Sequence, residues 1–218
     1  MLFVNYIDEN NFIIYNFLGD FMHTVKNNIE KTIIINKSKF ISKSYFVTDT
    51  NEANSIINNI KDEYSDATHV CFAYIINNNI KYSDDGEPNN TAGLPIYNVI
   101  SKNNLNCVLV IVIRYFGGIK LGAGGLTRAY SNSAIEVIND NITELVEGYN
   151  IEISLDYNSI KDVEYILKDI IIINKDYNDI ITINFEIPVD NVDVIKEKLN
   201  NHIKSFNIIK EIYIRKLL

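Results

Sequence analysis

Cysteine is scarce in this chain of 218 residues, which contains only Cys71 and Cys107. Both lie in apolar, strand-like runs, and neither belongs to a recognisable metal-binding motif. The sequence therefore predicts two reduced core residues and excludes a disulfide framework or a zinc site. A reducing, cytoplasmic compartment fits this composition.

Basic residues are also in short supply, because 20 Lys and Arg face 28 Asp and Glu, which gives a formal net charge of -8. Nonspecific affinity for nucleic acid comes from clustered Lys and Arg, so this balance excludes a protein that coats nucleic acid along its whole surface. Any contact with phosphate must be local.

A long uncharged apolar run is missing as well. Residues 1–21 are rich in Phe, Ile and Leu, but Asp8, Glu9 and Asp20 interrupt them and no basic segment opens them. This pattern predicts neither a signal peptide nor a membrane span, and we expect no membrane partner.

Glycine is rare outside one place. The chain contains nine glycines, and five of them lie within 117–125. The β-branched run Cys107–Ile113 before them predicts a strand that is buried on both faces at the centre of a sheet. From Leu126 onward, apolar residues recur at three- and four-residue intervals and predict a helix that packs on that sheet. The turn between strand and helix is therefore unusually glycine-rich.

Two interpretations of this turn are about equally supported by the sequence, an anion-binding site and a tight connection without a ligand. Arg114, Lys120 and Arg128 lie in a stretch without any acidic residue between Glu87 and Glu136. Exposed amides at a helix N-terminus, with cations around them, predict a receptor for phosphate or another anion. Glycines also permit a tight strand-to-helix connection that has no ligand. The candidate anion- or nucleic-acid-binding residues are Arg114, Tyr115, Gly117, Gly118, Lys120, Gly122, Gly124, Gly125 and Arg128.

An acidic loop at Ser83–Pro95 is the second segment whose residues could bind a ligand or metal ion. The oxygen atoms of Asp84, Asp85 and Glu87 could bind Mg²⁺, while carboxylates in turns more often cap backbone amides or pair with arginine. We favour capping and expect no cofactor.

His69 is the weak catalytic candidate. It precedes a strand and could transfer a proton near neutral pH, and period-two alternation places it on the same strand face as Cys71. No motif sets a nucleophile beside it, so we favour a structural role.

A change of pattern after Glu144 predicts an α+β protein of two domains, residues 22–146 and 147–218. The second domain shows the order strand (149–157), helix (160–168), strand (170–175), strand (180–187), helix (189–202), strand (206–215). This βαββαβ order is that of a ferredoxin-like sandwich. In the first domain, strands at 29–36 and 40–47 flank a turn at 37–39, and a helix follows at 50–64 with Thr50 or Asn51 as its N-cap.

Several segments together resemble the bacterial, YigZ-like members of the IMPACT family. They are Lys37-Ser38-Lys39-Phe40-Ile41, Asp66-Ala67-Thr68-His69, Ser83-Asp84-Asp85-Gly86-Glu87-Pro88, Thr91-Ala92-Gly93-Leu94-Pro95 and Arg114-Tyr115-Phe116-Gly117-Gly118-Ile119-Lys120-Leu121-Gly122. The resemblance covers roughly residues 24 to 140. It implies an N-terminal domain like the second domain of ribosomal protein S5 and a C-terminal domain like the last domain of elongation factor G. Because the acidic loop and the glycine-rich turn are both motifs of the family, the resemblance also implies that Asp84, Asp85, Glu87 and Thr91 face the turn across one groove. Since family members usually begin near Thr24, we predict that residues 1–21 are an extension created by an upstream mis-start.

Three functions follow from these observations. The first is a noncatalytic binding protein of the translation apparatus that contacts RNA or a ribosome-associated protein; the resemblance implies this through eukaryotic members, which are linked to a regulator of a translation-initiation-factor kinase. The second is a metal-assisted enzyme for a phosphorylated or anionic small molecule. The third is a protein-binding module. We favour the first, with Tyr115 and Phe116 stacking on bases if they are exposed.

Overall fold

The computed structural model describes residues 5–7, 13–15 and 22–216. Strands β1 (Asn5–Ile7) and β2 (Ile13–Tyr15) pair antiparallel with each other. The predicted N-terminal extension, residues 1–21, otherwise lies outside the described residues. Among the residues that are described, no helix combines the length and the apolar character needed to cross a membrane.

The N-terminal body is an antiparallel sheet of five strands in the order β4-β5-β8-β6-β7. Their bounds are β4 (Ile29–Ile35), β5 (Ser38–Phe46), β6 (His69–Ile76), β7 (Asn79–Ser83) and β8 (Val108–Tyr115). β8 lies in the middle, and its residues from Val108 to Ile113 are completely buried. The predicted central strand is therefore confirmed.

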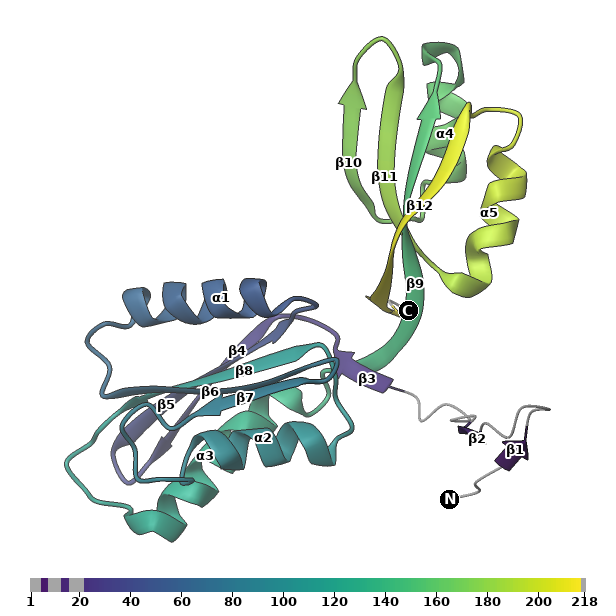
Figure 1. The fold of residues 1–218 in the computed structure, drawn as a ribbon. Helices are drawn as coiled ribbons and strands as arrows, with labels where there is room; N and C mark the ends of the chain where they lie inside the picture. The colour runs from purple at the N-terminus through teal and green to yellow at the C-terminus, as the bar shows by residue number, and fades with distance from the viewer. Residues whose placement is uncertain (1–4, 8–12, 16–21, 217–218) are drawn as a thin grey trace.

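Helices cover both faces of this sheet (Figure 1). α1 (Thr50–Glu63) packs on one face, and α2 (Gly93–Lys102) and α3 (Gly122–Ile138) pack on the other. The predicted N-cap of α1 is wrong by one or two residues, because the Asp49 side chain accepts the amides of Asn51 and Glu52. The hairpin turn between β4 and β5 falls at Asn36 and Lys37, which both have positive φ, so Ser38 already belongs to β5.

The C-terminal body is a second antiparallel sheet in the order β10-β11-β9-β12. Its elements follow the predicted βαββαβ order, with α4 and α5 on one face over an apolar core. Their bounds are β9 (Ile142–Leu155), α4 (Ile160–Ile166), β10 (Ile172–Tyr177), β11 (Ile181–Pro188), α5 (Val192–Leu199) and β12 (Ser205–Arg215).

One strand joins the two bodies. β9 begins against β3 (Met22–Val25), which packs on the N-terminal body, and continues into the C-terminal sheet. The domain boundary predicted at residue 147 therefore falls inside a continuous strand. Gly148 does not break β9: a Cβ there would collide with Ile214 and lie 2.7 Å from the Ile187 carbonyl oxygen, so close strand packing requires glycine.

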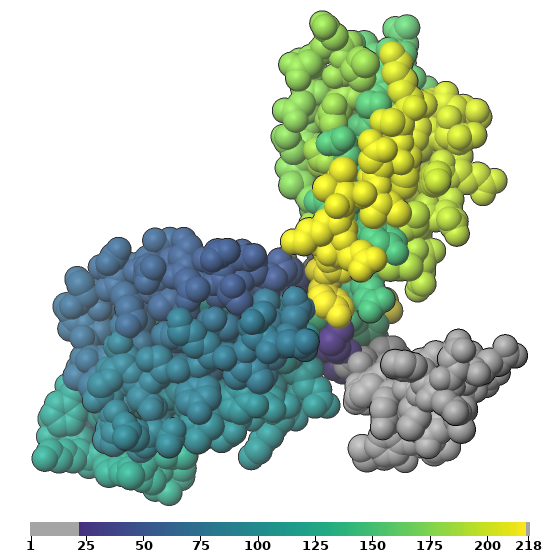
Figure 2. Space-filling view, viewed as in Figure 1, coloured from purple at the N-terminus to yellow at the C-terminus, as the bar shows by residue number. Residues whose placement is uncertain are grey.

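The junction between the bodies is narrow (Figure 2). Arg215, at the end of β12, donates a hydrogen bond from Nη1 to the Lys26 carbonyl oxygen at 2.9 Å. Its guanidinium also lies 4.5 Å from the centre of the Phe46 ring. These two contacts fasten the last strand to the N-terminal body.

Candidate functional site

The segments that carry the candidate functional residues meet at one end of the N-terminal sheet. β8 ends there, and β5 and β6 begin there because they run antiparallel to it, so Lys39 pairs with Tyr115 and His69 pairs with Arg114. The acidic loop follows β7 to the same place. The acidic loop contacts the start of the glycine-rich signature through the ion pair of Glu87 with Arg114. A groove between the loop and the turn stays a prediction.

A buried polar network occupies this end of the sheet. The Glu87 carboxylate accepts hydrogen bonds on Oε1 from Arg114 Nη1 at 2.6 Å and from the Tyr130 hydroxyl at 2.8 Å. Glu87 is 7% exposed and Arg114 is 5% exposed. We call this network the inner cluster; its members are Ser38, His69, Cys71, Glu87, Arg114 and Tyr130.

The sequence predicted Arg114 as a contact for phosphate. This prediction is wrong, because the side chain is buried and paired with Glu87. Its Nη2 donates to Ser38 Oγ at 3.3 Å, and its guanidinium lies 5.5 Å from the ring centres of both Phe40 and Phe116. Its Nε is buried and lacks a hydrogen-bond partner within the described residues. Burial and the pairing with Glu87 make Arg114 a structural cation.

His69 and Cys71 lie beside this pair, on the same strand face, as predicted. His69 Nε2 is 3.8 Å from Glu87 Oε2, and its Nδ1 is 2.9 Å from the Asp85 carbonyl oxygen. The Cys71 thiol donates to the Asp84 carbonyl oxygen at 3.0 Å. Burial raises the pKa of the Cys71 thiol far above its usual range, so the thiol stays protonated. His69 consequently has no activated nucleophile in this cluster.

Each carboxylate of the acidic loop has its own set of partners. Asp84 accepts the amides of Asn90, Ala92 and Gly93 and thereby caps the start of α2. Asp85 accepts from Lys61 Nζ at 2.6 Å and from the Val70 amide at 2.7 Å. Burial opposes ionisation of Asp85, but these two hydrogen bonds outweigh it and lower the pKa of the carboxyl group.

This arrangement lends no support to the magnesium site. Across residues 22–216 and the two short described strands, no group of three or more His, Cys, Asp and Glu side chains is placed to hold a metal ion. Thr91 is buried and donates to the Pro88 carbonyl oxygen at 2.6 Å, so it too serves its own loop.

The five glycines of the turn have different roles. A Cβ on Gly117 would collide with the backbone of Lys37, so this glycine permits the close approach of the segment after β8 to the turn between β4 and β5. Gly118 and Gly122 have φ of +84° and +67° and face open space. The helix begins at Gly122, earlier than predicted from Leu126, so Gly124 and Gly125 lie in the first turn of α3.

That first turn of α3 is open to an anion. Among the described residues no side chain caps it, and no acidic residue occurs in it. Gly122, Ala123 and Gly124 are all exposed. The first amides of a helix lack partners within the helix and carry its positive dipole end.

Exposed cations lie on the glycine-rich turn and in the first part of α3, and strand pairing brings two more, Lys37 and Lys39, to this end of the sheet. The Lys37 backbone packs against Gly117, and Lys39 pairs with Tyr115, with its Nζ 5.8 Å from the centre of the Tyr115 ring. We call this area the basic turn surface; its members are Lys37, Lys39, Phe116, Lys120 and Arg128. All five side chains are exposed, and no ion pair involves the four cations in the part of the chain that the structure describes.

The fold and the site thus define a class: an α+β protein whose signature turn has one buried end and one basic, exposed end. Residues 36–138 match the model of the Impact N-terminal domain. The chain is 41% identical over 158 residues to the IMPACT family member YvyE of Bacillus subtilis (strain 168), an alignment that covers 67% of this chain and 73% of the relative. The chain belongs to the IMPACT family.

Two further comparisons agree with this assignment. The chain is 29% identical over 175 residues to the IMPACT family member YigZ of Escherichia coli (strain K12), covering 76% of this chain and 85% of the relative. A crystal structure of a hypothetical protein superposes with a TM-score of 0.58 at 24% identity, covering 87% of this chain and 97% of that one. At this identity the superposition supports the fold alone.

Proposed function

We propose that the protein is a noncatalytic binding protein of the translation apparatus, which contacts RNA through the basic turn surface. The observation that carries this proposal is that four exposed cations, without an ion pair among the described residues, lie on the glycine-rich turn, on the start of α3 and on the hairpin that packs against the turn, in a chain whose net charge is -8. Lysine, arginine and free helix amides are the groups that contact phosphate in protein–nucleic acid complexes.

An exposed aromatic ring supports RNA as the polymer. Phe116 is 46% exposed and lies next to the turn, where a base could stack on it. Tyr115 is only half-exposed, and its hydroxyl donates to Asp66 at 2.8 Å, so we assign stacking to Phe116 alone. Single-stranded RNA fits this combination of cations and one exposed ring better than a duplex does.

The contact is assigned to the N-terminal body because the open face of the C-terminal sheet is less suited to phosphate. By strand register, this face presents Glu152 opposite Asn184 and Asp176 opposite Thr182, and Glu186 lies on it as well. Carboxylates on that face repel a phosphate backbone. The expected likeness of the two bodies to domains of ribosomal protein S5 and elongation factor G supports a place in translation.

The test is binding of single-stranded RNA and of ribosomes across a salt series, with Lys120→Glu and Arg128→Glu beside wild type. Each lost phosphate contact should weaken binding and reduce the slope of log K against log salt by about 1. Lys198→Glu is the matched control, since Lys198 is exposed on α5 and has no ion pair within the described chain. Wild-type-like slopes in both turn variants, or no RNA binding at low salt, would refute the proposal.

A further inference from the structure

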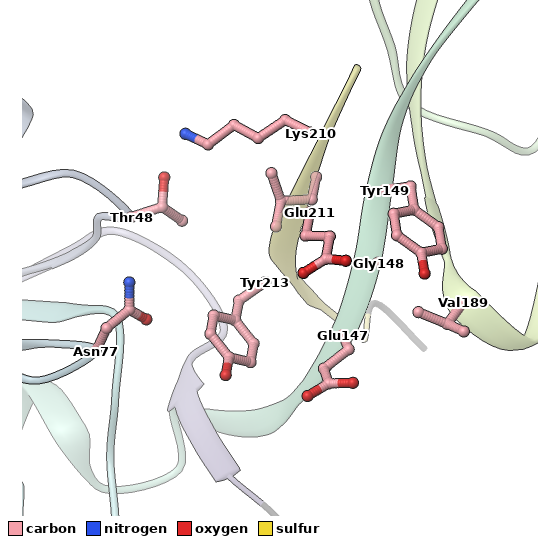
Figure 3. Close-up of a pocket in the computed structure, with 10 residues that line it drawn as sticks. Thr48, Asn77, Glu147, Gly148, Tyr149, Val189, Lys210, Glu211 and Tyr213 are labelled. Carbon is pink, nitrogen blue, oxygen red and sulfur yellow. The ribbon is translucent and has the colours of Figure 1, made fainter. Parts of the chain in front are cut away.

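A cavity of about 330 Å³ lies where the two bodies meet (Figure 3). Thr48 and Asn77 line it from the N-terminal body, while β9 and β12 form the opposite wall. It shares no residue with the inner cluster or the basic turn surface. Its volume falls at the lower end of the range of small-molecule sites, about 300–1,000 Å³.

The register of β9 and β12 sets the pattern of side chains on that wall. Glu147 pairs with Tyr213, and Tyr149 pairs with Glu211. Since alternate residues of a strand share a face, all four side chains lie on one face, with the two carboxylates on one diagonal and the two phenol rings on the other. The wall therefore offers two separated negative charges, each flanked by aromatic rings.

A positive charge stands at the other end of the cavity. Figure 3 shows the Lys210 amine directed toward Thr48 and away from the carboxylates of Glu147 and Glu211. No hydrogen bond or ion pair is found for these three charged side chains within the described residues. The charges of the cavity are thus separated from one another, and they are free to meet a ligand.

Tyr213 adds a donor between the two ends. Its ring is half-buried, and burial together with the nearby Glu147 carboxylate raises the pKa of its hydroxyl. The phenol therefore stays protonated and can donate a hydrogen bond. Tyrosine rings beside carboxylates also favour organic cations through their negative faces.

We propose that this cavity binds a dibasic amino acid, either free or at the end of a peptide. The α-ammonium and carboxylate of such a ligand are bonded to the same carbon, so they would pair with the neighbouring residues Glu211 and Lys210, and the side-chain cation would pair with Glu147. Two negative charges and one positive charge in the cavity match two positive charges and one negative charge in lysine or arginine at neutral pH. This site is independent of the RNA contact proposed above.

Calorimetric titration of the full chain with L-lysine tests the proposal. Cadaverine has both ammonium groups but lacks the carboxylate, and ε-aminocaproate has the carboxylate but lacks the α-ammonium. We expect L-lysine to bind and each analogue to bind at least about ten-fold more weakly, because each loses one charged hydrogen bond. No heat of binding with L-lysine or L-arginine at millimolar concentration would overturn the proposal.

Substitutions assign the contacts. Glu147→Gln and Glu211→Gln should each weaken the binding of L-lysine about ten-fold. Lys210→Gln should weaken the binding of L-lysine and leave the binding of cadaverine unchanged. Glu197→Gln and Lys198→Gln, on the exposed face of α5, are the matched controls. Unfolding curves without ligand verify that every variant folds. Equal binding by cavity variants and controls would also overturn the proposal.

Discussion

Arg114 and Arg128 belong to the same glycine-rich signature, yet they lie in opposite environments. The inner half, residues 114–117 apart from the exposed Phe116, is built into the protein: Arg114 is paired with Glu87, and Gly117 packs against the Lys37 backbone. The outer half, residues 118–128, is open: Lys120 and Arg128 are exposed, and the start of α3 is uncapped. One motif therefore divides into a half that stabilises the fold and a half that is available for binding.

This difference shows why residue type and spacing do not assign a role. A cation next to glycines is equally compatible with a buried ion pair and with a phosphate contact. Only the position of a carboxylate, here Glu87 from a different loop, separates the two. The predictions below test the division, beginning with the largest expected effect.

Removal of the buried carboxylate should have the largest effect. Glu87→Ala leaves Arg114 buried without its counter-ion, and the free energy of unfolding should fall by about 3–5 kcal/mol. Urea denaturation measures this loss. RNA binding, measured where the variant is still folded, should be retained because the outer half is unchanged.

A double substitution provides the control for this effect. Glu87→Leu with Arg114→Met removes both charges, so the loss should be much smaller than the sum of the single losses. Additive losses would show that the pair is not the reason for the stability of this end of the sheet.

The two neighbouring glycines offer the next comparison. Gly117→Ala places a methyl group against the Lys37 backbone and should cost about 2–3 kcal/mol of stability. The methyl group of Gly118→Ala meets no neighbouring atom, so the stability lost is only that of the left-handed backbone conformation, about 1 kcal/mol. Thermal unfolding compares the two variants, and equal losses would contradict the division between inner and outer halves.

A smaller effect is expected from acid. The folded-state pKa of Asp85 lies below its ordinary value of about 3.9, so its contribution is fully present above that value and is lost as pH falls through the folded pKa. The stability difference between wild type and Asp85→Asn should therefore shrink on acidification from about pH 6 to about pH 3. Lys61→Met removes the strongest partner of Asp85, so in that background the Asp85→Asn substitution should change stability less. A difference that stays constant with pH would contradict this assignment.

The central strand and the family could be predicted from sequence, because the β-branched run of β8 and the ordered motifs are local signals. Tyr130 could not be placed in the inner cluster, since its helical spacing marked it only as apolar and its hydroxyl partner, Glu87, is distant in the chain. α2 was missed because Gly93 and Pro95 at its start resemble a loop, although the cap from Asp84 and proline's tolerance of the first helical turn allow a helix there.

Tertiary contacts also explain the remaining differences between the sequence-based predictions and the structure. The domain boundary predicted at residue 147 falls inside β9, where Gly148 allows close packing against Ile214 and the Ile187 carbonyl oxygen. Lys37 and Lys39 had no evident link to the glycine-rich turn until the sheet placed the first hairpin beside β8. Long-range strand pairing, which no local pattern contains, sets these relations.

The most direct test compares Arg128→Glu with Arg114→Met in the same two measurements, the salt dependence of RNA binding and the free energy of unfolding. We predict that Arg128→Glu weakens binding, reduces the salt slope by about 1 and leaves stability nearly unchanged. Arg114→Met should lower stability and, while folded, keep the wild-type salt slope. A reduced slope in Arg114→Met, or an unchanged slope in Arg128→Glu, would contradict the division of the signature into a structural half and a binding half.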